Sequence, residues 1–403
     1  MWTGKSGIWK SVMGGAAATL LALAAPLASA QNTFKIGVLL PLTGVQSPDG
    51  TRVLQGHQLG AKMINDGGGI KALNGAKIEL VVADTQSRPE VARSEAERLI
   101  SREHVNVLTG AWTTAATLPA LQLAERAKIP FIIPNAFVDS LTEMGLKYVF
   151  RLTAKSSSIT TDVMNFAGYL KGKGVPVSKV GIIYEDGPYG QSVYDVATKG
   201  FGERGFEMVA EASFKGGASD LNTQVAKLKA ANAQLVVLGC FAPDAASILK
   251  AMAAQDYKPV ILGLSGGYMH PIITALGPLS ERSFGITDWM PDIKNAASEN
   301  FIKLYQAAYK ETPINTIALA YITVLVAANA AENAKSADPQ KVRDALATLR
   351  ITDGPAALLP GGVKFDATGQ NEMKNVGAEN IGGKFVTIWP EEVALQKLLI
   401  PGK

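Results

Sequence analysis

FKIGVLLPLTGVQSPDGTRVLQGHQLGAKMI, residues 34–64, contains the first strand and the first helix that the sequence predicts. Residues 34–40 are mostly apolar, as in a buried strand, and residues 53–64 place apolar side chains at helical spacing. The same unit follows at 77–83 and 89–100. Strands and helices that alternate at these lengths predict right-handed βαβ units around a parallel sheet, with helices on both faces.

The alternation continues through most of the chain in two series. The first series is completed by predicted strands at 105–109 and 130–133, a helix at 115–127 and an extended segment at 148–152. The second series consists of predicted helices at 157–170, 189–203, 221–231 and 244–255 and predicted strands at 179–184, 206–212, 235–238 and 260–262. Two successive α/β sheets of similar build predict two lobes, with a ligand in the crevice between them.

Beyond the second series the pattern becomes mainly helical. Its predicted elements are an extended segment at 283–288, helices at 296–310, 317–333 and 339–349, a linker or crossing at 353–362, and short strands at 363–365 and 384–389. Polar residues interrupt the stretch Thr316–Ala331, which therefore predicts a core helix rather than a membrane span. Before the helix at 89–100, Ser87 and Glu90 have the spacing of a capping box.

The composition limits the classes of protein to which the chain can belong. It has 403 residues, 47% of them apolar and 18% charged, with a formal charge of +4. These values exclude a disordered protein and a strongly basic nucleic-acid binder. The single cysteine, Cys240, excludes an internal disulfide, and because it follows an apolar run we expect it to be buried rather than nucleophilic. At roughly 150 residues per domain, the length predicts two or three folding units.

The first thirty residues have the layout of a secretory signal peptide. Lys5 and Lys10 precede an uncharged, apolar stretch that ends in Ala28-Ser29-Ala30, which predicts cleavage before Gln31. Removal of residues 1–30 with their two lysines leaves a formal charge of +2. A nearly neutral surface gives no reason to expect nucleic acid or an anionic membrane as a partner. We therefore expect a soluble, exported protein.

Catalytic motifs in the chain are incomplete. Residues 263–267 match the G-x-S-x-G nucleophile elbow, so a secreted hydrolase that uses Ser265 is an alternative from another class. The only histidines are His57, His104 and His270, and none lies where such a hydrolase takes its base. No metal-ligand spacing, phosphate-binding loop or dinucleotide fingerprint is present. We therefore expect no enzyme activity, no bound metal and no cofactor.

The informative residues lie in loops at the carboxyl ends of predicted strands. After the strand at 105–109, Thr113 and Thr114 stand where a helix begins. Hydroxyl groups beside the free N–H groups of a helix N-terminus suit a carboxylate, although either threonine could simply cap the helix. Aromatic residues occupy four such loops: Phe137, Tyr189, Phe241 and Tyr268. We expect them to line a cleft that closes on a flat or apolar body.

Several short motifs occur in a specific order and spacing. They are Ile36-Gly37-Val38, Pro41-Leu42-Thr43-Gly44, Gly56, Gly60-Ala61, Ile64-Asn65, Gly68-Gly69-Ile70, Gly75, Asp84-Thr85, Pro89, Val107, Gly110, Thr113-Thr114, Ile129-Pro130, Pro134 and Tyr189-Gly190. Through them, and over essentially all of its length beyond residue 30, the chain resembles the type I periplasmic solute-binding proteins of ABC transporters, the group related to the Leu/Ile/Val-binding proteins.

The resemblance implies an α/β fold of two doubly wound parallel-sheet lobes joined by three crossings. Lobe 1 is then expected to comprise residues 31–152 and 287–356, and lobe 2 residues 153–286 and 357–403. Such proteins are not enzymes: they close over one small molecule in the periplasm and deliver it to ABC permease subunits at the inner membrane. We expect a monomeric receptor of this kind. A regulatory module that senses amides or urea is a further alternative, which the export signal disfavours.

The resemblance also assigns residues to the ligand site. Thr114 matches the hydroxyl that binds the α-carboxylate of the ligand, and Thr113 precedes it. Asn135 falls where a backbone carbonyl meets the amino group of the ligand. Tyr189 and Phe241 match aromatic residues on the second lobe.

Two positions depart from the pattern of the amino-acid-binding members. Phe137 stands where a threonine helps to bind both ends of an amino acid, and Ser265 stands where an acidic residue pairs the ammonium. Burying an ammonium without a counter-charge is costly, although Asp49 or Asp288 could supply that charge. The aromatic residues that favour a carboxylate with an aromatic or bulky apolar body are Trp112, Phe137, Phe241 and Tyr268. An organic acid of this kind and a branched-chain amino acid remain the two expected ligand classes.

Overall fold

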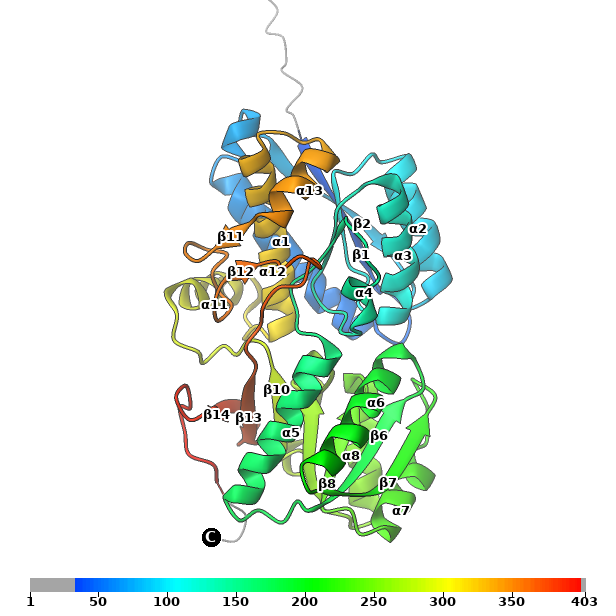
Figure 1. Cartoon of the computed structure of the whole chain (residues 1–403). Helices are drawn as coiled ribbons and strands as arrows, with labels where there is room; N and C mark the ends of the chain where they lie inside the picture. Colours follow the sequence, from blue (N-terminus) through cyan, green and yellow to red (C-terminus); the bar gives the residue numbers. More distant parts are fainter. Residues whose placement is uncertain (1–32, 400–403) are drawn as a thin grey trace, which may run out of the picture. The chain divides into compact units, whose positions relative to one another are not determined.

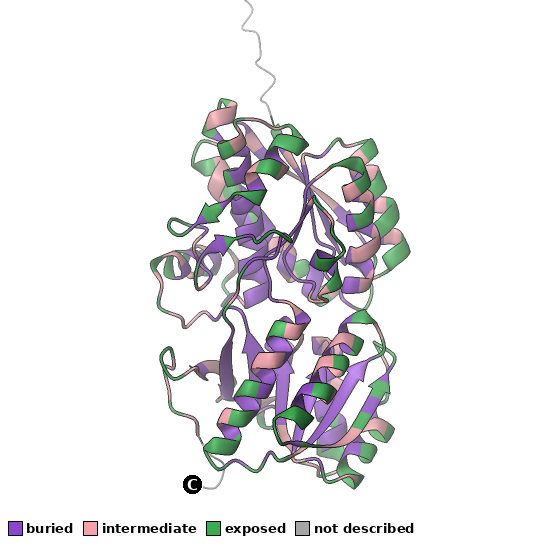
Figure 2. Ribbon diagram, viewed as in Figure 1, coloured by how far each residue is buried: buried purple, intermediate pink, exposed green. Residues whose placement is uncertain are grey.

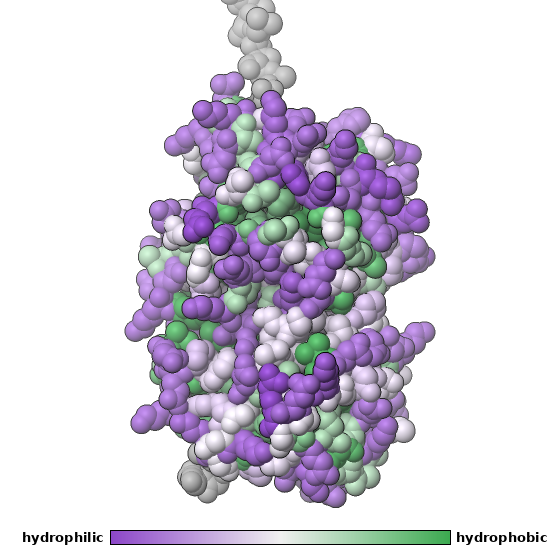
Figure 3. Space-filling model, in the orientation of Figure 1, coloured by the Kyte–Doolittle hydropathy of each residue, from purple (hydrophilic) through white to green (hydrophobic). Residues whose placement is uncertain are grey.

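The computed structural model describes residues 33–399 (Figure 1). The predicted signal peptide, residues 1–30, lies outside the described residues. Two large sheets organise the rest of the chain, and their central strands are buried in each lobe (Figure 2). Hydrophilic side chains cover most of the face seen in Figure 3, and apolar residues appear there only in small patches.

Lobe 1 contains five parallel strands in the order β2-β1-β3-β4-β5. The strands are β1 (Thr33–Leu40), β2 (Lys77–Asp84), β3 (Val107–Thr109), β4 (Phe131–Ile133) and β5 (Val149–Arg151). Helices α1 (Ser47–Asp66), α12 (Asn315–Ala334) and α13 (Pro339–Ala347) lie on one side of this sheet, and α2 (Pro89–Ser101) and α3 (Thr114–Ala127) lie on the other (Figure 1). Because side chains alternate along a strand, Ile36 and Val38 of β1 pack toward α1 and α12, whereas Leu39 packs toward α2 and α3.

Helix α12 forms the centre of the lobe 1 core. It is apolar almost all round, and every residue from Asn315 to Ala328 is buried. Its length and composition would allow it to cross a membrane, but most of the helix is buried inside the protein. The predicted core helix is therefore confirmed.

Lobe 2 contains seven strands in the order β14-β13-β10-β9-β8-β6-β7. The strands are β6 (Lys179–Glu185), β7 (Glu207–Phe214), β8 (Leu235–Gly239), β9 (Val260–Leu264), β10 (Phe284–Thr287), β13 (Val376–Ile381) and β14 (Lys384–Trp389). The first five of these are parallel, and β13 and β14 add an antiparallel edge. Helices α5 (Ser156–Gly172) and α6 (Pro188–Glu203) pack on one face, and α7 (Asn222–Ala230) and α8 (Ala242–Ala254) pack on the other.

The remaining elements complete the two lobes. They are α4 (Ser140–Glu143), α9 (Ser265–Tyr268), α10 (Pro271–Thr274), α11 (Ala296–Tyr309), the strands β11 (Arg350–Ile351) and β12 (Val363–Lys364), and 3-10 turns at Lys71–Leu73 and Gly277–Leu279. Cys240 is buried, as expected, and burial raises the pKa of its thiol. The predicted alternation of strands and helices in two lobes is confirmed.

The passage from lobe 1 to lobe 2 lies later in the sequence than expected. Leu358, Val363 and Phe365 pack in the same core as β1 and α12. Residues 353–362 are therefore part of lobe 1 and not a crossing, and lobe 1 extends beyond the expected boundary after residue 356. The chain returns to lobe 2 just before β13, which the sequence pattern did not predict because it mixes apolar residues with Gly, Glu and Asn.

The predicted capping role of Ser87 is wrong. Arg88 is the N-cap residue of α2, and no side chain caps that helix. The Ser87 hydroxyl instead donates to the carbonyl oxygen of Thr43 at 2.8 Å and accepts from the Gln46 N–H at 3.1 Å. Ser87 therefore ties the loop after β2 to the loop after β1.

Gly56 lies where α1 packs closely against α12, so a larger side chain at this position tests that contact. A Cβ at Gly56 would lie 2.3 Å from the carbonyl oxygen of Ile317. We predict that Gly56→Ala lowers the melting temperature, although alanine is the better helix former. A matched control is Gly168 in α5, where an added Cβ meets no heavy atom within 4 Å. Gly168→Ala should stabilise the protein by about 0.5–1 kcal/mol. Thermal unfolding followed by circular dichroism measures both, and equal shifts would contradict the prediction.

Candidate ligand-binding site

Loops at the carboxyl ends of the parallel strands meet between the lobes. Strands β1 and β3 are neighbours, yet the helices that follow them lie on opposite faces of the sheet. Strands β6 and β8 of lobe 2 have the same relation. Sheets of this type bind ligands outside the carboxyl ends of the strands at such a switch point. Here the ring centroids of Phe137, after β4, and Tyr189, after β6, lie 5.7 Å apart, so the two sets of loops touch.

Three of the four predicted aromatic residues form a continuous aromatic wall: Phe137, Tyr189 and Phe241. The ring centroids of Tyr189 and Phe241 lie 5.3 Å apart. Burial raises the pKa of the Tyr189 phenol well above its ordinary value, so the ring presents a neutral surface. Tyr268 does not join this wall. It packs in the lobe 2 core, with its ring centroid 6.0 Å from that of Phe385.

The polar groups of the site gather where β3 leads into α3. Gly110 has φ of +123° at the end of β3, and a Cβ there would lie 2.1 Å from the carbonyl oxygen of Leu39. This close approach brings the N-terminus of α3 to the edge of the sheet. Thr113 is the N-cap residue, and its hydroxyl accepts from the Ala116 N–H at 3.2 Å. Thr113 therefore has the capping role that was one of its two expected roles.

Several buried polar atoms near this helix start have no hydrogen-bond partner among residues 33–399. They are Thr114 Oγ1, both side-chain atoms of Asn135, and Trp112 Nε1. All three residues are buried. Because nearly all buried polar groups in proteins are hydrogen-bonded, such a cluster has the capacity to bind polar groups of a ligand.

Asp49 of lobe 1 faces His270 of lobe 2. Asp49 Oδ1 lies 3.6 Å from His270 Nε2, and each side chain is only 3% exposed. The Ile272 N–H donates to His270 Nδ1 at 3.1 Å, which places the proton of the neutral imidazole on Nε2. Burial raises the pKa of Asp49 to about 7, more than the charge of Arg52 lowers it. Burial also lowers the pKa of His270 to about 4.

Asp288 is bonded to other parts of the chain. Thr153 donates to Asp288 Oδ2 at 2.7 Å, and Asn315 Nδ2 donates to Asp288 Oδ1 at 3.0 Å. The carboxylate is fully buried, which raises its pKa, while these hydrogen bonds act in the opposite direction. Of the two acids expected to balance an ammonium, Asp49 is the one whose second oxygen has no hydrogen-bond partner.

The geometry around Ser265 does not assemble the catalytic groups of a hydrolase. Ser265 has φ of +46° at a strand-to-helix turn, as a nucleophile elbow requires. Its hydroxyl, however, accepts from Asn315 Nδ2 at 2.7 Å. His270 faces Asp49 and Ile272 through its two ring nitrogens. Within residues 33–399, no three His, Cys, Asp or Glu side chains gather to hold a metal ion.

Sequence reasoning missed two residues of this region. The sequence pattern assigned His270 no role in ligand binding, and Asn315 was not singled out. Both are buried and carry a polar atom without a partner, Nε2 and Oδ1 respectively. Asn315 is a polar residue directly before the long apolar run at 316–328, and this position was the sequence feature that could have identified it.

The fold and the paired strand-end loops define a two-lobed solute-binding protein of the type I class. Residues 33–376 match the periplasmic binding protein family, and the chain belongs to that family. Its relatives include Leu/Ile/Val-binding protein homolog 7 of Brucella suis, which is 30% identical over 401 residues, or 95% of this chain and 97% of the relative.

Solved structures share the fold. The branched-chain amino acid transporter substrate-binding protein LivJ of Streptococcus pneumoniae, in complex with isoleucine, is 25% identical with a TM-score of 0.79, over 88% of this chain and 100% of that one. An ABC transporter solute-binding protein of R. palustris, in complex with benzoate, is 21% identical with a TM-score of 0.79, over 92% of this chain and 98% of that one. By its family the chain is thus a periplasmic binding protein, and its relatives carry the name Leu/Ile/Val-binding protein homolog.

The Asp49 carboxyl predicts a pH dependence of stability. Its pKa of about 7 in the folded protein exceeds its ordinary value of 3.8. The protonated carboxyl therefore stabilises the fold below about pH 4, and this contribution is lost as the pH rises through about 7. We predict that Asp49→Asn melts close to wild type at about pH 4 and increasingly above it as the pH rises to about 8.5.

Thermal melts of the two proteins across this range provide the measurement. The lowered pKa of His270 affects stability between about pH 6.5 and about pH 4, but both proteins carry His270, so the difference between their melting temperatures reports Asp49. A constant difference between the two proteins would contradict the prediction.

Proposed function

We propose that the chain is an exported receptor that closes over a small carboxylate with an aromatic or bulky apolar body. In this proposal it works in the periplasm as a monomer without a cofactor and delivers its ligand to ABC permease subunits. The observation that carries the proposal is the combination of unpartnered polar atoms at the start of α3 with an aromatic wall beside them.

The start of α3 is suited to the carboxylate end of such a ligand. Helix N-termini carry free N–H groups and a partial positive charge, which favour an anion. Thr114 can donate its hydroxyl to one carboxylate oxygen, and Asn135 can donate its amide to the other, since neither side chain has a partner in the described part of the chain. Both residues come from neighbouring strands of lobe 1, so a ligand held there is oriented before lobe 2 covers it.

The aromatic wall is suited to the other end of the ligand. Phe137 lies on lobe 1, and Tyr189 and Phe241 lie on lobe 2. Aromatic rings pack favourably against one another in tilted and offset arrangements, so a flat ligand would contact both lobes at once. Contact with both lobes favours the closed protein, because the ligand binds that state more tightly than the open one.

A ligand without an ammonium group fits the charges of the site best. An amino acid needs a counter-charge, and Ser265 and Phe137 do not supply one. Asp288 is bonded to Thr153 and Asn315. The benzoate complex of the R. palustris protein shows that this fold accepts an aromatic acid.

A branched-chain amino acid is the second candidate ligand. The observation that favours it is Asp49, which has one oxygen without a partner and could pair an ammonium. The isoleucine complex of the S. pneumoniae protein supports the same ligand class.

A ligand screen tests the proposal directly. Thermal shifts of the purified protein should be compared for benzoate, other aromatic acids, aliphatic carboxylates, leucine and isoleucine. A ligand at a hundred times its Kd stabilises the native state by about 2.7 kcal/mol, which raises the melting temperature measurably. A shift with leucine or isoleucine, and none with aromatic acids, would contradict the proposed ligand class.

Thr114→Ala tests the carboxylate end. Losing a hydrogen bond to a charged group costs about 1.5–3 kcal/mol, so the Kd for a bound carboxylate should rise roughly 10- to 100-fold. Thr223→Ala, at an exposed position on α7, is the matched control and should leave the Kd unchanged. Isothermal titration calorimetry measures both variants, and an unchanged Kd for Thr114→Ala would remove this residue from the site.

Asp49→Asn separates the two ligand classes. If the ligand is an organic acid, this variant should bind it as tightly as wild type or more tightly, because a negative charge has been removed. If the ligand is an amino acid, the loss of the counter-charge should weaken binding at least tenfold. Titrations with benzoate and isoleucine at about pH 8, where Asp49 is ionised, decide between the two.

A further inference from the structure

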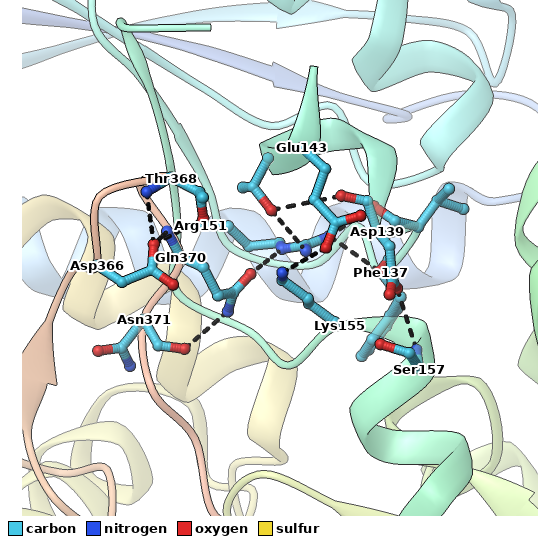
Figure 4. A network of polar contacts seen from close by, with 12 residues as sticks. Phe137, Asp139, Glu143, Arg151, Lys155, Ser157, Asp366, Thr368, Gln370 and Asn371 are labelled. Atoms are coloured by element: carbon cyan, nitrogen blue, oxygen red, sulfur yellow. Dashed lines mark hydrogen bonds and ion pairs between the residues drawn. The ribbon is translucent and has the colours of Figure 1, made fainter. Parts of the chain in front are cut away.

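Arg151, the last residue of β5, is completely buried at the centre of the polar network drawn in Figure 4. Its Nη1 donates to the carbonyl oxygens of Phe137 at 2.9 Å and Val138 at 2.7 Å. Its Nη2 donates to the Thr142 hydroxyl at 3.0 Å, and its Nε donates to Gln370 Oε1 at 2.6 Å. Nη1 also donates to the carbonyl oxygen of Ala136 at 3.3 Å. In all five contacts the guanidinium group binds a neutral oxygen.

The charge of Arg151 is balanced only at longer range. Asp139, Glu143 and Asp366 are near enough to raise its pKa, but each is bonded to another residue (Figure 4). Burial is the larger effect and lowers the pKa of Arg151 to about 10, so the group is charged at neutral pH. A planar guanidinium group binds several backbone oxygens at once and so holds a loop in one orientation. A lysine ammonium is a point charge and could not fix the loop in this way.

The segment that Arg151 holds belongs to the candidate site. Its carbonyl contacts fall on residues 136–138, which carry Phe137 of the aromatic wall and follow Asn135. The carbonyl oxygen of Phe137 also accepts from the Ser156 N–H at 2.8 Å. One atom of this segment therefore contacts both Arg151 of lobe 1 and the first turn of α5 in lobe 2.

Gln370 connects the same guanidinium to two crossings. Its Nε2 donates to the carbonyl oxygen of Thr153 at 2.8 Å, in the crossing that leads from β5 to α5. It also donates to the carbonyl oxygen of Asn371 at 2.7 Å, in the segment that leads toward β13. The backbone reinforces the link, because the Arg151 N–H donates to the carbonyl oxygen of Gly369 at 2.8 Å.

We propose that Arg151 is a positioning residue that fixes the segment 135–138 for ligand binding and couples it, through Gln370, to the crossings between the lobes. The inference rests on the proposed function, because it takes Asn135 and Phe137 as ligand contacts. A shift of this segment on binding would then be transmitted to the crossings through the one guanidinium group.

Gln370→Leu and Arg151→Lys test the proposal, with Thr142→Val as the matched control. Thr142→Val also removes one buried contact of the guanidinium group, but it leaves the contacts with residues 136–138 and Gln370 intact. Each protein should be titrated with benzoate and with isoleucine by calorimetry. Amide hydrogen exchange without ligand should be followed in the segments 135–143 and 152–157. Gln370→Leu decides the question if Arg151→Lys does not fold.

We expect Gln370→Leu to bind at least tenfold more weakly than wild type and to exchange faster in both segments, with little change elsewhere. Thr142→Val should bind within about threefold of wild type. Unchanged exchange in Gln370→Leu, or exchange that rises evenly over the whole protein, would overturn the proposal. If wild type binds neither probe, the proposed ligand classes fail, and the exchange comparison still decides whether Arg151 couples the two segments.

Discussion

The buried carboxylate of Asp288 secures the place where the chain passes between the lobes. Thr153 of the first crossing donates to one of its oxygens, and Asn315 at the start of α12 donates to the other. A buried carboxylate is stable only while hydrogen bonds replace the water it has lost. Separating these elements would leave the carboxylate without these hydrogen bonds, so the contact opposes any motion that pulls Thr153 away from the start of α12.

The two lobes contribute different chemistry to the candidate site. Lobe 1 supplies the hydroxyl of Thr114 and the amide of Asn135, whose directions would orient a ligand. Lobe 2 supplies the rings of Tyr189 and Phe241, whose contacts depend on area rather than on direction. The polar end of a ligand can therefore bind before the lobes close, and the closed lobes can accept variation in its apolar end.

The alternation of apolar runs and helical stretches was enough to predict the two sheets, because buried parallel strands and their covering helices have distinct periods. The edge strand β13 was not predictable in this way, since it depends on antiparallel pairing with β10 from a distant part of the chain. The expected end of lobe 1 at residue 356 differs from the structure for a related reason. Val363 and Phe365 pack against elements that come much earlier in the sequence.

For the candidate site, sequence position predicted which loops meet but not where each side chain points. Thr114 and Phe137 lie at the strand ends as expected, while Tyr268 turns into the core of lobe 2. His270 and Arg151 matter through partners that only the folded chain brings together.

The packing of α1 and β1 against α12 has a consequence for how the protein is made. The core of lobe 1 joins the first strand of the chain to a helix from its last quarter. Lobe 2 likewise needs β13 and β14 to complete its sheet. Neither lobe can finish its core during synthesis until most of the chain has emerged, and contacts between distant segments slow folding. The two cores can therefore form completely only after the C-terminal third of the chain is available.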